Sequence, residues 1–369
     1  MANKDMIWYF RSIARKRCSM HMIDCFKSMY KVVHLIPYDG VGGVEAAANS
    51  MGNQRREEID FKLEYIYPNY SDDASYKIYN PLYLMTSAMN IIRECPDLLI
   101  VSLWRSYIVG IIVKIFRPRI RLVTFLHLAK HAHLIDRMVT TIAVRLSHEV
   151  WGDSQQTLTS RLDGISYTKS QVISFVTKRI APFKSKSIQP VFIYWGRIHA
   201  QKKIQRALRF FSSIRAKYPT ARYIIIGPDG GSLNEIKNTC KSLSLDESVN
   251  FIGSCSFDEI SGYAGEASFY LQTSEVEGMA MSVVEAMQLG LVPIVTPVGE
   301  IGKYARNGEN AVVVTDDDSA VADVLDLLKD KQRYQNMRQQ AINTWKNKPL
   351  YKDSVLAACQ DVLDMEKSH

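Results

Sequence analysis

EGMAMSVVE, residues 277–285, carries two carboxylates eight positions apart. Glu277 lies in a loop of small residues, and Glu285 lies in a predicted helix over residues 281–289. Apolar runs at 269–273 and 292–295 predict a strand on either side, so the order is strand, loop, helix, strand. Two carboxylates can hold the hydroxyls of a polyol, and the first N–H groups of a helix favour an anion. A sugar nucleotide has both features.

The two carboxylates also have a simpler explanation. Glu275 and Glu277 could be loop residues in water, and Glu285 could be an exposed helix residue. Against this, Glu285 lies among Val283, Val284, Ala286, Met287 and Leu289 in an apolar helix. A lone carboxylate in such surroundings needs a partner, which favours a functional role.

Outward from this stretch, short apolar runs alternate with helical patterns, which is typical of parallel sheets with crossover helices. The predicted strands of the second half lie at 191–194, 223–226, 249–252, 269–271 and 292–295, with helices at 203–217, 231–243, 257–265 and 281–289. The predicted strands of the first half lie at 32–36, 63–67, 98–101, 121–125, 149–151 and 171–175. The polar, proline-containing stretch 180–190 reads as a linker. Two doubly wound α/β domains are therefore predicted, with ligands at the carboxyl ends of their strands.

We divide the chain into four segments. They are a basic amphipathic segment at 1–30, an N-terminal Rossmann-like domain on the acceptor side at 31–183, a C-terminal nucleotide-sugar-binding Rossmann-like domain at 184–347, and a C-terminal helix at 348–369.

Composition narrows the class of protein. With 369 residues, 47% of them hydrophobic and 23% charged, the chain fits a globular protein of two domains. No apolar run reaches the length of about 20 residues that a membrane span requires, and no signal peptide is predicted. The six cysteines are scattered, so neither structural zinc nor a disulfide framework is expected, and a cytoplasmic location is the simplest reading.

The net charge of +8 indicates an anionic partner. Residues 1–31 hold seven Lys and Arg against two Asp, interleaved with aromatic and aliphatic residues. Such a segment suits an anionic membrane surface, although a solvated extension before the first strand remains open. A second cluster comprises Lys114, Arg117, Arg119 and Arg121. No recognised nucleic-acid module is present, so a nucleic-acid partner is not expected.

Three further loops follow predicted strands. Gly42 and Gly43 form a glycine-rich turn in which backbone N–H groups can approach a pyrophosphate, or which simply allows tight packing. Arg197 and Lys202 can bind phosphate and stabilise a leaving diphosphate, although an exposed basic loop is the duller alternative. His127 suits a single hydrogen bond to a ligand or a structural capping role. A metal site with His131 and His133 is not expected.

Taken together, these motifs resemble those of the retaining, nucleotide-sugar-dependent glycosyltransferases of glycosyltransferase family 4, which have the GT-B fold. The resemblance covers residues 31–347 and is strongest over 191–314. The matching motifs are Glu277-Gly278 with Glu285-Ala286, Gly196-Arg197-Ile198 with Lys202, Gly42-Gly43-Val44-Glu45, the strand-end His127, the helix-opening Ser154, and loosely the loop 227–230. It implies two Rossmann-like domains facing across a cleft, with the last helix returning to the N-terminal domain.

The resemblance also implies roles. Glu285 would hold the ribose hydroxyls, and Glu277 with the backbone of Gly278, Met279, Ala280 and Met281 would hold the transferred sugar. Arg197 and Lys202 would grip the diphosphate, with Lys203 a substitute by one register. Gly42 and Gly43 would approach the diphosphate, and His127 would contact the sugar or the acceptor near the reacting carbon. Such enzymes need no metal, because the cations replace its charge.

Several positions depart from the family pattern. Met279-Ala280 replaces the usual Phe-Gly, Lys203 replaces a Gly, and the stretch Val298-Gly299-Glu300-Ile301-Gly302-Lys303 replaces Val-Gly-Gly-x-Pro-Glu. The first and last of these changes alter the surroundings of the sugar and the nucleotide, so the donor is left open.

The resulting hypothesis is a cytoplasmic, peripheral membrane hexosyltransferase without a cofactor. Its donor would be a nucleoside diphosphate sugar, and its acceptor would be a saccharide or a lipid-linked saccharide in polysaccharide or lipopolysaccharide assembly. A nucleotide-sugar epimerase of the same fold and an inactive nucleotide-sugar-binding protein are the alternatives. A glycogen-phosphorylase-like reading lacks its cofactor-binding lysine region.

Overall fold

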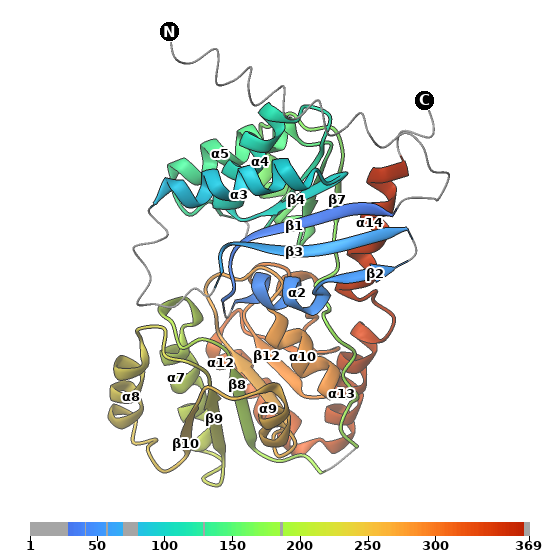
Figure 1. Cartoon of the computed structure of the whole chain (residues 1–369). Coiled ribbons are helices and arrows are strands. Elements are labelled where there is room, and N and C mark those ends of the chain that lie inside the picture. Colours follow the sequence, from blue (N-terminus) through green and yellow to red (C-terminus); the bar gives the residue numbers. More distant parts are fainter. Residues whose placement is uncertain are drawn as a thin grey trace. The chain divides into compact units, whose positions relative to one another are not determined.

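The computed structural model describes residues 29–40, 42–56, 58–68, 80–127, 130–184 and 187–364. Most of the predicted segment 1–30 lies outside these residues. The chain divides into two compact units, one of Met1–Thr177 with Leu350–His369 and one of Lys178–Pro349 (Figure 1).

The first unit is a parallel sheet with one antiparallel edge strand. Its strands lie in the order β2-β3-β1-β4-β5-β6-β7, and β2 alone among them pairs antiparallel. The strands are β1 (Tyr30–Tyr38), β2 (Gln54–Arg56), β3 (Ile59–Tyr67), β4 (Leu98–Ser102), β5 (Arg121–Leu126), β6 (Glu149–Gly152) and β7 (Ser170–Val172). The helices are α2 (Gly43–Met51), α3 (Pro81–Glu94), α4 (Trp104–Phe116), α5 (Leu134–Leu146), α6 (Gln155–Leu162) and α14 (Tyr351–Asp364).

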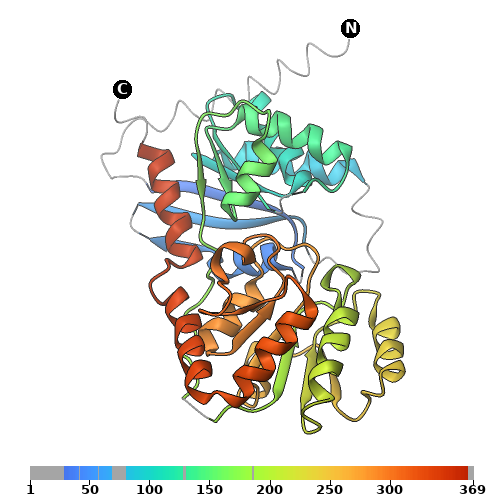
Figure 2. The same ribbon diagram turned by 180° about the vertical axis from the view of Figure 1, so that it is seen from behind.

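Successive side chains of β1 point to opposite faces of the sheet, and their contacts show what covers each face. Val33 and Leu35 point into an apolar core with Ala88 of α3 and Val109 of α4. The intervening His34 contacts Phe125 on the other face. Phe125 also stacks with Tyr351, the first residue of α14, so the last helix completes the core of the first unit. Figure 2 shows α14 from behind beside this sheet.

The second unit is an all-parallel sheet in the order β10-β9-β8-β11-β12-β13. Its strands are β8 (Val191–Trp195), β9 (Arg222–Ile226), β10 (Val249–Gly253), β11 (Phe269–Gln272), β12 (Val292–Val295) and β13 (Val312–Val313). Its helices are η2 (Ala200–Lys202), α7 (Ile204–Arg215), α8 (Leu233–Ser242), α9 (Phe257–Ala264), α10 (Met281–Leu289), α11 (Ile301–Tyr304), α12 (Asp317–Lys329) and α13 (Lys331–Lys346). β8 and β11 are buried throughout, as strands covered by helices on both faces must be.

Two boundaries differ from the predicted ones. The sequence predicts a domain boundary after residue 183, and the structure places it after Thr177. The backbone N–H of Ile180 donates to Gln288, and that of Phe183 donates to the carbonyl of Leu289, so this stretch is tied to the second unit. At the other end, Lys348 and Pro349 stay with the second unit, and the N–H of Tyr351 donates to Val176 of the first.

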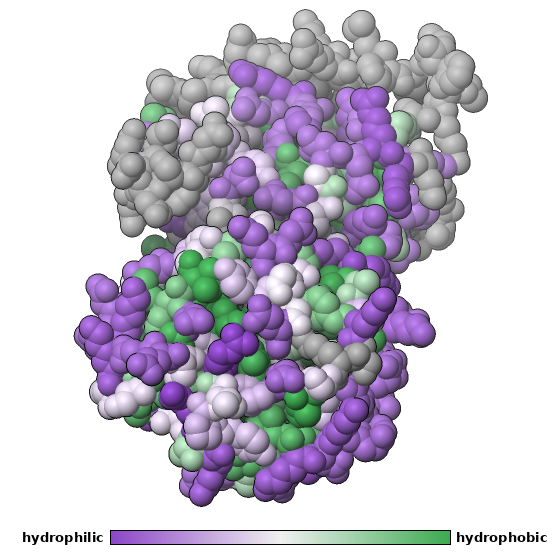
Figure 3. All heavy atoms as spheres, turned by 90° about the horizontal axis from the view of Figure 1, so that it is seen from below, coloured by the Kyte–Doolittle hydropathy of each residue, from purple (hydrophilic) through white to green (hydrophobic). Residues whose placement is uncertain are grey.

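Apolar side chains are mostly interior. On the face seen from below in Figure 3, hydrophilic residues form most of the edge of the lower part, and hydrophobic ones show in patches between them. None of the described helices has an apolar stretch of the length that a membrane crossing requires.

Candidate active site

Strand order in the second unit sets the place of the candidate site. The chain runs from β8 outward to β9 and β10, and then returns to the other side of β8 with β11, which pairs with β8 in parallel. The loops that follow β8 and β11 therefore diverge at a switch point, the usual place for a ligand in such sheets. Residues 196–203 form the first of these loops and residues 273–280 the second.

Hydrogen bonds fix the two loops to each other. The amide of Gln201 donates to the carbonyl of Val276 at 2.6 Å, and the N–H of Glu275 donates to the carbonyl of Gln201 at 3.0 Å. The hydroxyl of Thr273 donates to the carbonyl of Lys203 at 2.9 Å. Side chains on both loops are thus held in one arrangement.

Lys202 and Glu277 form the central ion pair of the site. The distance from Lys202 Nζ to Glu277 Oε1 is 2.6 Å, and the two side chains are 21% and 7% exposed. The amide of Gln272 also donates to Glu277 Oε1, at 3.0 Å, and the hydroxyl of Tyr270 fixes that amide from its oxygen side at 2.7 Å. A nearly buried carboxylate is thereby satisfied on one oxygen, and its other oxygen can accept from a ligand hydroxyl.

Glu285 projects from α10 and has different partners. Its Oε2 accepts from the indole N–H of Trp195 at 2.9 Å, and its Oε1 lies 3.9 Å from Lys178 Nζ. Burial raises the pKa of Glu285, while the bond from Trp195 and the charge of Lys178 oppose that rise. The Trp195 and Tyr270 rings are in edge contact, so Glu285 and Glu277 belong to one connected cluster.

Arg197 is exposed at the start of the first loop. A Cβ added to Gly230 would lie 2.8 Å from Arg197 Cγ, so the stem of the arginine packs on the loop after β9. Among the described residues its guanidinium has no hydrogen bond or ion pair. It can therefore take two phosphate oxygens without breaking an existing contact.

Lys203 is directed differently from Lys202. Its Nζ lies 2.8 Å from Glu275 in a surface pair whose side chains are 47% and 62% exposed. The structure therefore does not join Lys203 to the Lys202–Glu277 pair. Its backbone has a φ of 49°, an unusual value for a residue other than glycine, where η2 ends and α7 begins.

Residues 278–281 form the turn into α10. Ala280 precedes the helix with a φ of 55°, and no side chain caps the first N–H groups of α10. Gly299 presses on this turn from the loop after β12, because a Cβ there would lie 2.2 Å from the carbonyl oxygen of Glu277. The N–H of Glu300 donates to Gly278 at 3.0 Å, and the hydroxyl of Tyr304 donates to Met279 at 3.0 Å. These contacts fix the turn into α10, and the first N–H groups of the helix have no side-chain cap.

The remaining predicted residues lie in the first unit. Gly42 precedes α2 in extended conformation, and Gly43 is the first residue of that helix. A Cβ on Gly42 would lie 2.2 Å from a carboxylate oxygen of Glu45, which folds back over the turn. His127 follows β5. The turn after β1 that holds Gly42 and the loop after β5 that holds His127 both lie at the carboxyl edge of the sheet, and β4 lies between these two strands.

A buried chain of hydrogen bonds holds His127. Its Nε2 lies 3.0 Å from Ser102 Oγ, and the Nε2 of His34 lies 2.8 Å from the same oxygen. The Nδ1 of His127 is 4.0 Å from Asp153. Burial lowers the pKa of His34 to about 3 and that of His127 well below its usual value, so both rings are neutral at neutral pH. The serine has one proton and two lone pairs, so at most one ring can accept from it and at least one ring must donate to it.

Sequence reasoning missed four of these residues: His34, Ser102, Lys178 and Gln272. A signal existed for His34, since it is the one polar side chain in the predicted strand 32–36. The other three become partners only through the tertiary fold.

The sequence does not predict a metal at His127, His131 and His133, and these histidines have other contacts. The Nδ1 of His133 accepts from the backbone N–H of Asp136 at the start of α5. The Nδ1 of His131 lies 3.6 Å from the side-chain carboxylate of Asp136. Within the described ranges no group of three potential ligands could hold a metal ion.

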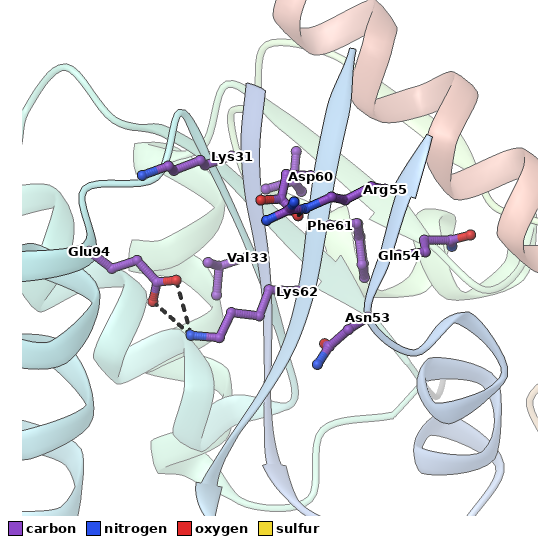
Figure 4. Close-up of a pocket in the computed structure, with 10 residues that line it drawn as sticks. Lys31, Val33, Asn53, Gln54, Arg55, Asp60, Phe61, Lys62 and Glu94 are labelled. Atoms are coloured by element: carbon purple, nitrogen blue, oxygen red, sulfur yellow. Dashed lines mark hydrogen bonds and ion pairs between the residues drawn. The ribbon is translucent and has the colours of Figure 1, made fainter. Parts of the chain in front are cut away.

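A cavity of about 580 Å³ lies elsewhere, at the amino ends of β1 and β3 (Figure 4). Lys62 points toward Glu94, at 3.0 Å, and Arg55 pairs with Asp60. Ligands in doubly wound sheets bind at the opposite ends of the strands, so we assign this cavity no role.

A family model matches most of the second unit. Residues 177–344 match the model described as Glycosyl transferases group 1. The switch-point loops, with Lys202, Glu277 and Glu285, all lie within the matched residues.

Curated relatives point the same way. A GDP-mannose:cellobiosyl-diphosphopolyprenol alpha-mannosyltransferase of Komagataeibacter xylinus is 25% identical over 137 residues, which cover 37% of this chain and 35% of the relative. The chain thus spans about a third of the length of that relative. An N-acetyl-alpha-D-glucosaminyl L-malate synthase of Bacillus anthracis is 23% identical over 347 residues, 82% of this chain and 89% of the relative.

A solved structure extends the likeness over both units. Anabaena HepE in complex with UDP-glucose superposes with a TM-score of 0.71 at 16% identity, over 92% of this chain and 100% of HepE. At this identity the likeness shows the fold alone, which is the GT-B fold that the sequence predicts.

Proposed function

We propose that this protein is a retaining glycosyltransferase. It takes a hexose-like unit from a nucleoside diphosphate sugar and transfers it to a hydroxyl of a saccharide or lipid-linked acceptor. The observation that carries the proposal is the match of residues 177–344 to the group 1 glycosyltransferases, together with a switch point that joins Lys202 to Glu277 and holds Glu285 nearby.

Each part of the donor would have its own side chains in this site. A diphosphate would replace Glu277 as the partner of Lys202, and a sugar hydroxyl would replace Lys202 as the partner of Glu277. Arg197 and the first N–H groups of α10 would complete the diphosphate contacts within the second unit. Glu285, held by Trp195, would accept from the ribose hydroxyls.

Retention requires the old and new bonds to lie on one face of the sugar. The bond from the anomeric carbon to the diphosphate oxygen breaks, the bond to the acceptor oxygen forms, and the acceptor proton passes to the departing diphosphate. Rate enhancement then comes from positioning and from the charges of Lys202 and Arg197, without a metal. His127 of the first unit is neutral at neutral pH, so any part it takes would be by hydrogen bonding rather than as a cation.

The named relatives support the donor class and leave its identity open. One name specifies GDP-mannose, and the HepE structure contains UDP-glucose. The name of the Komagataeibacter xylinus relative also specifies a polyprenol-linked acceptor. We extend this to a lipid-linked saccharide of cell-surface polysaccharide or lipopolysaccharide assembly, met at the cytoplasmic face of a membrane with help from residues 1–30.

Two substitutions test the site. Glu285→Gln and Arg197→Ala should each lower turnover by about 100-fold or more, the scale of one lost preorganised electrostatic contact. Glu266→Gln and Arg222→Ala alter an exposed pair elsewhere in the same unit and serve as matched controls. Near-normal turnover of purified Glu285→Gln or Arg197→Ala would reject the assignment.

The donor itself is found by thermal shift with a panel of nucleoside diphosphates and their sugars. A ligand at a hundred times its Kd stabilises the protein by about 2.7 kcal/mol, so the donor should stand out. Conversion of the donor alone into an isomer would indicate an epimerase instead. Tight binding without product across a panel of acceptors would indicate an inactive binding protein.

A further inference from the structure

An exposed apolar surface on the first unit has no part in the site described above. Of the large hydrophobic residues that the described chain exposes, seven out of nine lie on three consecutive helices. They are Leu82 and Met85 of α3, Ile115 of α4, and Leu134, Ile135, Met138 and Ile142 of α5. The α4 helix packs against both α3 and α5, as Figure 1 shows. We call the exposed face of these three helices the α3–α5 face.

The α5 helix presents the densest part of this face. Leu134, Met138 and Ile142 recur every four residues and are 78%, 65% and 46% exposed. Residues four apart lie on one side of a helix, so the three form a continuous stripe, with Ile135 beside it. Single exposed apolar residues are ordinary, but a stripe of this kind marks an interaction surface.

The charges around this stripe have one sign. Between Asp97 and Glu149 the chain has eight Lys and Arg and a single acidic residue, Asp136. Asp136 points inward, where it accepts from Thr140 and Arg161 at 3.0 Å each. It therefore offsets none of the outward cations.

Four of the cations are exposed near the ends of the stripe. Lys130 and Arg137 lie toward the start of α5, Arg145 lies in its last turn, and Arg119 follows α4. Within the described residues none of these four has an ion-pair partner. Apolar side chains bordered by unpaired cations are the pattern of a helix that lies in the interface of an anionic bilayer.

We propose that the α3–α5 face docks on an anionic lipid bilayer, with the apolar stripe of α5 inserted among the acyl chains and the flanking arginines at the phosphates. None of the residues that form this face belongs to the segment 1–30. The inference rests on the proposed function only in taking a membrane as the place where a lipid-linked acceptor is met. Vesicle binding is measured without donor or acceptor, so either proposal can fail alone.

The test is co-sedimentation of the full chain with vesicles. The protein should bind vesicles of phosphatidylcholine and phosphatidylglycerol much more tightly than vesicles of phosphatidylcholine alone, and salt should weaken the binding. Met138→Ser with Ile142→Ser should lower the partition coefficient by about tenfold or more. Arg137→Ala with Arg145→Ala should lower it by about 25-fold, at about fivefold for each charge removed.

Matched variants keep the test specific. Val172→Ser removes an exposed apolar side chain elsewhere in the first unit, and Lys241→Ala removes an exposed cation from the second, so both should bind vesicles as the unaltered protein does. The substituted residues are exposed, and an unchanged unfolding temperature confirms that each variant is folded. Unchanged vesicle binding by both double variants would overturn the proposal. So would loss of self-association in sizing experiments without loss of vesicle binding, which would make a second copy of the chain the partner.

Discussion

Glu285 is subject to opposing influences on its pKa. Burial raises the pKa, whereas the Trp195 bond and the Lys178 charge lower it, and burial dominates. The carboxylate must be ionised to accept from two ribose hydroxyls. Nucleotide affinity should therefore fall as the pH falls through the raised pKa of Glu285, at a higher pH than an ordinary glutamate would give.

Replacing Lys178 with Gln tests this account. The substitution removes a favourable charge 3.9 Å from Glu285 Oε1, so the pKa of Glu285 should rise further. The midpoint of the affinity-versus-pH curve, measured by calorimetric titration of a nucleoside diphosphate, should therefore move to higher pH. Glu285→Gln should abolish the transition altogether. An unmoved midpoint in Lys178→Gln would contradict the coupling.

Residue spacing was enough to locate some of this cluster but not its partners. Glu277 and Lys202 could be predicted because each lies in a loop that follows a strand, and Glu285 because it is the one carboxylate of an apolar helix. Lys178 and Gln272 could not, since each reaches its carboxylate only after separate segments of chain pack together. The pairing of Lys202 with Glu277 could not be predicted either, because the sequence indicates the two groups only as ligands for different parts of a donor.

Most elements agree with their apolar patterns, and the exceptions have local causes. The predicted strand 171–175 ends at Val172, where the chain leaves the sheet toward the second unit. The short strand β2 was missed because Gln54–Arg56 is entirely polar and pairs only at the sheet edge. α12 and α13 are separate helices because Asp330 follows the end of α12 and its side chain caps the start of α13.

The loop after β12 shapes the start of α10 through Gly299. This residue has a φ of 59°, and a Cβ would meet the Glu277 carbonyl oxygen at 2.2 Å. Gly299→Ala should therefore displace the Glu277 turn and weaken donor binding by about tenfold or more, on top of about 1 kcal/mol of backbone strain. Calorimetric titration with the donor measures the first effect, and thermal unfolding measures the second.

Gly308 provides the matched control. Its φ is 75°, and nothing lies within 4 Å of an added Cβ. Gly308→Ala should show similar strain and unaltered donor affinity. Equal affinity losses in both alanine variants would mean that Gly299 does not support the site.

At the scale of the whole molecule, the two α/β units could be predicted from the sequence, but the residues at which they begin and end could not. Alternating strands and helices revealed two doubly wound units, because that pattern is local. The boundaries depend on which unit binds the connecting stretch, and Arg179 shows this by donating to the carbonyl of Trp345 at 2.7 Å. No pattern in the sequence of residues 178–184 predicts that contact.

The α14 helix gives a test at this scale. Ala358 is 2% exposed and its neighbour Ala357 is exposed. Ala358→Asp would bury an unpaired carboxylate and should destabilise the first unit by about 3 kcal/mol or more, whereas Ala357→Asp should be close to neutral. Nucleotide binding by the second unit should be intact in both variants. Calorimetry with and without nucleotide separates the two effects, and equal stability of the two variants would contradict the packing of α14.

The position of α14 also bears on biosynthesis. The first unit has its sheet in the opening half of the chain, but Tyr351 and the helix behind it emerge from the ribosome only after the whole second unit. We therefore expect the part made first to be the last to acquire its native fold, and the interior part to be complete while translation is still under way. Protease protection of stalled nascent chains that lack α14 would show this order directly, and a fully protected first unit in such chains would refute it.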